Sequence, residues 1–130
     1  MGKDWIKNKR VGSILNIVAT YAWGAGLGTI HSASAKAGVL SLARTLAVEW
    51  GSKYGIRVNA IAPGPIENTE GVTRLIEERN MYQQAIDAVP LKRFGKAEEI
   101  AGLAYFLLSL EAEYINGDCI TMDGGKWLNN

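Results

Sequence analysis

Short apolar runs alternate along the chain with longer segments of helical character. Residues 14–18 are apolar at every position except Asn16, and such a run favours a strand in a parallel sheet that is covered on both faces. Two further short strands are predicted at 57–62 and 119–122. The Pro-Gly-Pro turn at 63–65 should end the second strand, because proline cannot donate to the sheet ladder.

The segments between and after these strands have helical patterns. Residues 32–50 should form a long helix, ended by Gly51 and Gly55, with apolar side chains nearly all the way round. Such a helix is buried on more than one side, so we expect one side to cover the sheet and the other to meet a partner subunit. Residues 69–88 form a looser, charged helical region. Residues 97–109 form an amphipathic helix with acidic residues in its first turn.

Strands that alternate with helices predict an α/β fold with right-handed crossovers and a parallel sheet. Three strands make a thin sheet, and the strand at 14–18 needs a neighbour on each side. The pattern is typical of the second half of a doubly wound, Rossmann-type fold. We therefore expect residues 1–130 to be the C-terminal part of one domain, with the N-terminal cofactor-cradle half missing.

Composition narrows the classes of function. The chain has 130 residues, a formal net charge of +1 and 48% hydrophobic residues, which suits one folded domain. No lysine/arginine run stands out, so we expect no nucleic-acid surface. The longest apolar stretch, 100–110, falls well short of the ~20 residues of a membrane helix, and residues 1–10 lack the apolar core of a signal peptide. The single cysteine, Cys119, excludes an internal disulfide, and we expect a cytoplasmic protein without a metal site.

The most distinctive motif opens the long helix. Residues 32–39 read Ser-Ala-Ser-Ala-Lys-Ala-Gly-Val and closely resemble the catalytic helix of the short-chain dehydrogenase/reductases, a likeness that extends over nearly the whole chain. In most of that family a tyrosine lies four residues before the lysine, and here that residue is Ser32. The nearest upstream tyrosine is Tyr21, and its spacing to Lys36 resembles that of the 2,4-dienoyl-CoA reductase branch.

The resemblance implies a role for each of these residues. Tyr21 is the candidate catalytic and substrate-binding tyrosine, and it follows a strand, where ligands of open α/β sheets bind. Lys36 would hold the nicotinamide ribose and lower the pKa of a neighbouring phenol; by position alone, it could instead pack its stem and extend its ammonium into water. Ser32 is either a substrate-binding residue or the N-cap of the helix. The usual family serine falls on Ala19, so either Tyr21 is used or the chain is catalytically inactive.

A turn and an arginine complete the predicted site. The family resemblance places the segment Pro63, Gly64, Pro65 and Ile66 along the nicotinamide, and glycine permits close backbone approach there. Dienoyl-CoA reductases carry an arginine at the place of Arg74 that contacts the coenzyme A part of the substrate, and guanidinium suits phosphate. The alternative for this residue is an exposed helix arginine.

The glycine-rich loop at 24–28 imitates a dinucleotide-binding fingerprint. A true fingerprint needs a tight strand-to-helix turn and an acidic residue that ends the next strand, whereas the candidate here, Glu49, lies inside the predicted helix. We expect these glycines to give the loop room beside the substrate. Trp23, just before them, either lines the acyl pocket or packs.

Together the motifs predict an oxidoreductase that reduces 2,4-dienoyl-CoA thioesters with NADPH, with NADH left open, in the oxidation of unsaturated fatty acids. Residues 1–130 alone are expected to be inactive, since they lack a pyrophosphate cradle. Two alternatives stay open: another acyl-CoA or carbonyl reductase of the same family, and a non-catalytic assembly module. The expected partners are the acyl-CoA substrate and further copies of the chain, bound through the helix at 32–50 and the C-terminal strand, with a homotetramer as the candidate assembly.

Overall fold

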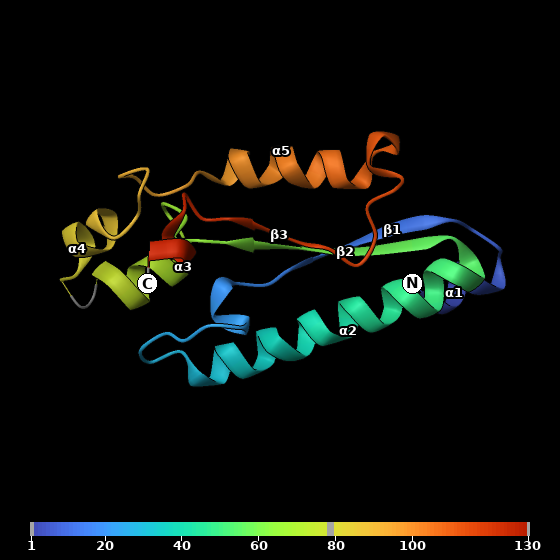
Figure 1. The fold of residues 1–130 in the computed structure, drawn as a ribbon, viewed down its shortest axis with the longest axis horizontal. Helices are drawn as coiled ribbons and strands as arrows, with labels where there is room; N and C mark the ends of the chain where they lie inside the picture. Colours follow the sequence, from blue (N-terminus) through green and yellow to red (C-terminus); the bar gives the residue numbers. More distant parts are fainter. Residues whose placement is uncertain (1, 78–79, 130) are drawn as a thin grey trace.

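A three-layer α/β arrangement is seen in the computed structural model, which describes residues 2–77 and 80–129. The middle layer is a parallel sheet with the strand order β1-β2-β3, built from β1 (Gly12–Ile17), β2 (Ile56–Pro63) and β3 (Cys119–Met122). The helix α2 (Ile30–Tyr54) runs along one face of the sheet and α5 (Ala97–Leu108) along the other (Figure 1). The three strands and α5 lie where the sequence predicts them, apart from one or two residues at the ends.

The core lies on both faces of β2, the central strand. Successive side chains of a strand point to opposite faces, so β2 contributes to clusters on both faces of the sheet. Ile56 and Val58 pack with Ala43 and Ala47 of α2, and Ile61 packs on the other face with Leu107 of α5. Each side of this strand is buried against a helix, and its two polar residues, Arg57 and Asn59, donate to carbonyl oxygens of α5 and of the segment that follows it.

Strand β1 is less buried than the sequence suggests. Its residues are partly exposed, and Ile17 is 45% exposed. Among the described residues β1 pairs with β2 alone, in a register that sets Ile14 opposite Val58. The strand is therefore an edge of this sheet, as expected for a strand that needs a second neighbour.

Helix α2 is longer than the prediction of 32–50. Gly51 lies inside the helix, and Gly55 ends it in the left-handed conformation, with φ of 66°. Glycine is favoured at this position because it adopts positive φ without a steric penalty from Cβ. The prediction that Gly51 ends the helix is wrong.

Only one face of α2 is buried. Its buried residues are Leu40, Ala43 and Ala47, whereas Leu42 is 54% and Val48 75% exposed. The expectation of a helix covered on more than one side does not hold within the described part of the chain. The partner subunit expected on this exposed face stays a prediction.

Residues 69–88 form several short pieces instead of a continuous helical region. These are α3 (Glu70–Val72), a π-helical turn at Thr73–Glu77 and α4 (Tyr82–Asp87). A helix that the sequence analysis missed, α1 (Gly2–Lys7), precedes β1. Its Trp5 and Ile6 pack against the cluster of Ala43 and Ala47, so α1 adds to the core on the face of the sheet that α2 covers.

Neither a membrane span nor a metal cluster is found in residues 2–77 and 80–129. No helix in these ranges is both long enough and apolar enough to cross a membrane. The same ranges contain no group of three or more His, Cys, Asp and Glu side chains that could hold a metal ion.

Candidate functional site

The candidate residues gather at the carboxyl ends of the three parallel strands. Two backbone hydrogen bonds prolong the ladder past the strand ends: Val18 N donates to Ile61 O over 2.8 Å, and Gly64 N donates to Met122 O over 3.1 Å. The segments that follow β1, β2 and β3 therefore leave the sheet on the same side (Figure 1). This edge is where open α/β sheets bind their ligands.

Tyr21 lies in a single 3-10 turn, Thr20–Ala22, that directly follows β1 and packs against α2. Its hydroxyl is 3.1 Å from Ser32 Oγ, and either atom can donate. The helix begins at Ile30, with Thr29 as its N-cap residue. Ser32 is thus inside the first turn, and the alternative that it caps the helix is wrong.

Lys36 lies one helical turn after Ser32. Residues four apart share a face of a helix, so Lys36 and Ser32 point toward the same region. The Lys36 ammonium donates to the Ile17 carbonyl oxygen, at the end of β1, over 2.7 Å. An ammonium has three N–H donors, so two remain for a ligand. The lysine head is therefore held at the strand end, beside the segment that carries Tyr21.

The turn after β2 approaches the end of β3 closely. A Cβ at Gly64 would be 2.7 Å from Asp123 Cβ and 2.8 Å from Asp123 Cα, distances that any larger residue would have to relieve by moving the backbone. Gly64 therefore permits a close approach to Asp123, and the predicted approach of this backbone to a nicotinamide stays a prediction. Pro63 is the last residue of β2.

The backbone around Ile66 offers a donor that fits a nicotinamide carboxamide. Gly95 N donates to Pro65 O over 2.9 Å and Glu67 N donates to Gly95 O over 2.9 Å, which makes a parallel bridge between Ile66 and Gly95. In such a bridge the amide of Ile66 itself faces away from Gly95. No acceptor for Ile66 N–H occurs in the described residues, so this group can donate to a carboxamide oxygen, while Lys36 offers donors for ribose hydroxyls.

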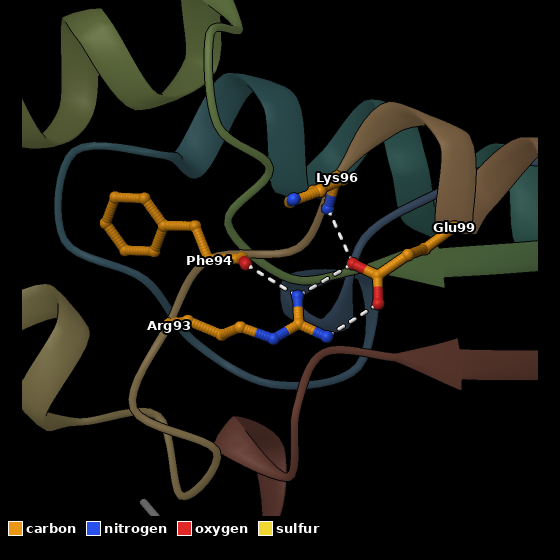
Figure 2. Close-up of polar contacts among 4 residues, drawn as sticks. All are labelled: Arg93, Phe94, Lys96 and Glu99. Atoms are coloured by element: carbon orange, nitrogen blue, oxygen red, sulfur yellow. Dashed lines mark hydrogen bonds and ion pairs between the residues drawn. The ribbon is translucent and has the colours of Figure 1, made fainter.

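An ion pair that sequence reasoning missed lies next to this turn. Arg93 Nη1 and Nη2 bind Glu99 Oε2 and Oε1 over 2.8 and 2.6 Å, as Figure 2 shows. The hydrogen bond from Arg93, followed by that from Lys96 N, lowers the pKa of Glu99 to about 2. The sequence contains one signal for the role of Glu99. This residue is the third of the helix that follows Lys96, and a carboxylate at that position can accept a hydrogen bond from the backbone N–H of the N-cap residue, as in a capping box.

Arg74 and Trp23 lie in surroundings that leave their roles open. Arg74 pairs with Glu70 over 2.5 Å, four residues earlier, and its side chain is 69% exposed. This is the arrangement of an exposed helix arginine, and contact with coenzyme A stays a prediction.

Trp23 packs edge-on against Trp127 of the C-terminal 3-10 turn, with the two ring centroids 5.8 Å apart. The alternative that Trp23 lines an acyl pocket stays a prediction.

Comparison with known proteins gives the family. A family model described as "Enoyl-(Acyl carrier protein) reductase" matches residues 3–126. The chain belongs to the short-chain dehydrogenase/reductase family. The resemblance inferred from the motif at 32–39 is therefore confirmed, and so is the fold class, since solved short-chain dehydrogenases superpose on these residues.

Three relatives in this family show how far the likeness reaches. A Bacillus subtilis protein named probable 2,4-dienoyl-CoA reductase is 68% identical over 127 residues, which cover 98% of this chain and 50% of the relative. A short chain dehydrogenase from Bacillus anthracis is 63% identical with a TM-score of 0.88, covering 96% of this chain and 48% of that one. An Agrobacterium tumefaciens structure with bound NADP is 36% identical with a TM-score of 0.88, covering 99% and 51%. The chain thus spans about half the length of the relatives it matches.

Proposed function

We propose that the protein carrying these residues reduces 2,4-dienoyl thioesters of coenzyme A with NADPH. The observation that carries the proposal is the contact of the Tyr21 hydroxyl with Ser32 Oγ at 3.1 Å. Ser32 occupies the place where most members of the family have a tyrosine, so the contact brings a phenol from another segment to that place. The name of the Bacillus subtilis relative supports the same substrate class.

Each residue of the candidate site then has a chemical task. The nicotinamide, when bound, supplies a hydride to the conjugated acyl chain. Tyr21 donates a hydrogen bond to the thioester oxygen as negative charge develops there, which is the role of an oxyanion donor. Ser32 orients the phenol, and Lys36 holds the ribose through the N–H groups that the Ile17 carbonyl does not use. Water supplies the proton that completes the reduction.

The cofactor and the acyl carrier are recognised by groups on the other side of the site. Ile66 N–H would hold the carboxamide oxygen of the nicotinamide. The turn at Pro63, Gly64 and Pro65 would keep this backbone in place, since it is bonded to Met122 and Gly95. The bound NADP of the Agrobacterium tumefaciens structure supports the choice of NADP over NAD. Arg74 would release Glu70 to bind a phosphate of coenzyme A, since guanidinium suits phosphate oxygens.

The test is the oxidation of NADPH by the protein expressed from its complete gene, followed by absorbance with 2,4-dienoyl-CoA and with 3-ketoacyl-CoA. Tyr21→Phe removes one hydroxyl and should lower turnover on the dienoyl substrate at least ~100-fold, as loss of an oxyanion donor does. Tyr105→Phe makes the same chemical change at a residue that is 81% exposed on α5, and its turnover should equal that of the wild type.

The possible results separate the candidate functions. Near-normal turnover of Tyr21→Phe would show that this tyrosine does not act on the substrate. A preference for the 3-ketoacyl substrate would favour another reductase of the family. A protein that assembles into oligomers but binds neither NADPH nor NADH would be the non-catalytic module.

A further inference from the structure

We propose that Arg93 and Glu99 are positioning residues, which hold the turn at 63–67 in the geometry that receives the nicotinamide. The inference rests on the proposed function, because it assumes that this turn binds the nicotinamide. It assigns a task to a pair of side chains that do not themselves reach the reacting atoms. The pair acts through Gly95, which lies between the two residues in the sequence and bonds to the turn.

The first step is that the ion pair connects the two ends of the loop at 93–99. The guanidinium binds both carboxylate oxygens, a two-point contact that fixes orientation as well as distance. Arg93 Nη1 also donates to Phe94 O over 3.0 Å, and Lys96 N donates to Glu99 Oε2 over 2.8 Å. Figure 2 shows the contacts of Arg93 at its guanidinium and the contact of Lys96 N at the Glu99 carboxylate. The backbone of the loop is therefore tied to α5 at both ends of the segment that contains Gly95.

The second step is that Gly95 connects the loop at 93–99 to the turn at 63–67. Its N–H and carbonyl bind Pro65 and Glu67, so Ile66 is bridged by one residue of the loop. A Cβ at position 95 would be 2.7 Å from Ile66 Cδ1, which shows how closely the loop lies against the turn. A displacement of Gly95 would therefore move the backbone on both sides of Ile66.

The third step is that side-chain packing alone does not fix the turn. A cavity of about 130 Å³ lies between the turn, the loop and the end of β3. Its lining includes Pro65, Ile66, Arg93, Glu99, Met122 and Asp123. Side chains that line this pocket pack on few neighbours there, so backbone atoms of the turn are held largely by hydrogen bonds. These are the bonds to Gly95, the bond from Gly64 N to Met122 O, and the bond from Thr69 Oγ1 to Ile66 O over 2.7 Å.

An exposed ion pair without such a role is the competing explanation. The side chains of Arg93 and Glu99 are 50% and 35% exposed, and pairs at the surface usually contribute little to stability. The two explanations differ in what a substitution should change. A positioning pair affects the binding of the nicotinamide end of the cofactor and leaves the binding of the adenine end alone.

The experiment uses the protein expressed from its complete gene and two probes, NADPH and adenosine 2′,5′-bisphosphate, which lacks the nicotinamide half. We expect Arg93→Gln and Glu99→Gln each to raise the Kd for NADPH about tenfold, the size of one lost hydrogen bond, and to leave the Kd of the bisphosphate unchanged. The double variant should match the single ones, because both substitutions remove one shared contact. Lys92→Gln removes a charge from the same loop, where its ammonium bonds to Asp87 O, and should leave both Kd values unchanged.

Each other result overturns the inference. Unchanged NADPH binding in both variants, or an equal loss with both probes, would show that the pair has no selective effect on the nicotinamide end. If Arg93→Gln does not fold, Arg93→Lys replaces it, since it keeps the charge but loses the two-point contact, and it should weaken NADPH binding selectively as well. A wild-type protein that binds neither NADPH nor NADH would overturn the proposed function together with this inference, whereas normal wild-type binding with unaffected variants would overturn the inference alone.

Discussion

Alanine at position 64 should destabilise the protein, although the substitution adds only one methyl group. The new Cβ would lie 2.7 Å from Asp123 Cβ and 2.8 Å from Asp123 Cα, whereas ordinary contacts begin at 3.4 Å. Asp123 cannot easily yield, because its carboxylate accepts hydrogen bonds from Gly125 N at 2.9 Å and Trp127 N at 2.6 Å. The turn and the end of β3 would have to separate, and the bond from Gly64 N to Met122 O would lengthen.

Two opposing terms set the size of the effect. Inserting a methyl group into a packed contact usually costs about 1–3 kcal/mol. Replacing glycine by alanine returns about 0.4–1 kcal/mol, because the unfolded chain loses conformational freedom. The two ranges leave a net loss of between about 0 and 2.6 kcal/mol, with a central value of about 1.3 kcal/mol, in the free energy of unfolding of the Gly64→Ala variant.

The assay is equilibrium unfolding in urea, followed by tryptophan fluorescence, with the midpoint as the measured quantity. Gly102→Ala provides the matched control, since a Cβ there meets nothing within 4 Å in the part of the chain that the structure describes. In the interior of α5, alanine should stabilise the helix by up to about 1 kcal/mol. The reasoning fails if Gly64→Ala is as stable as the wild type, or if both variants lose the same stability.

Two further predictions concern the core and the ion pair. Leu107→Ala should lower the free energy of unfolding by about 2–5 kcal/mol, because Leu107 is 0% exposed. Leu108→Ala is the control, and it should change this free energy little, because Leu108 is 51% exposed. The urea midpoints of the two variants are compared. The folded-state pKa of Glu99, about 2, lies below its ordinary value of 4.5, so the pair contributes stability above pH 4.5 and loses it as the pH falls toward 2. The difference in thermal midpoint between the wild type and Glu99→Gln should stay constant from about pH 5 to 8 and shrink below that window; a difference that grows on acidification would contradict the assignment.

The apolar runs of the strands were sufficient to predict the sheet, but the glycines of α2 show what a sequence leaves open. Gly51 and Gly55 both suit a helix end, and only the second one ends it. A Cβ at Gly51 would be 2.7 Å from the amide nitrogen of Asn116, which donates to Ala47 O while its carbonyl accepts from Val58 N. Gly51 therefore makes room for a residue far away in the sequence, a contact that no local pattern reports.

The candidate site divides in the same way into local and distant parts. The resemblance of the motif at 32–39 to the family, together with the spacing of Tyr21 to Lys36, marks both residues in the sequence. The sequence pattern predicts a helix that starts at Ser32, where this residue could be the N-cap, whereas α2 begins two residues earlier, at Ile30. The pair of Arg93 and Glu99 could not be connected with the turn at 63–67, since that connection requires a loop to fold back on a distant strand end.

The sheet register connects the two sides of the candidate site. Tyr21 and Lys36 depend on the end of β1, whereas Ile66 depends on the end of β2 and on the loop that braces it. The ladder sets Ile17 opposite Ile61, so it fixes how far the phenol and ammonium lie along the sheet from the turn. A slip of one residue would turn every side chain of β1 to the other face. It would take Ile14 away from the cluster of Ala43 and Ala47, and Leu15 away from the cluster of Leu107. The apolar pattern that predicts the strands therefore also determines which functional groups can meet.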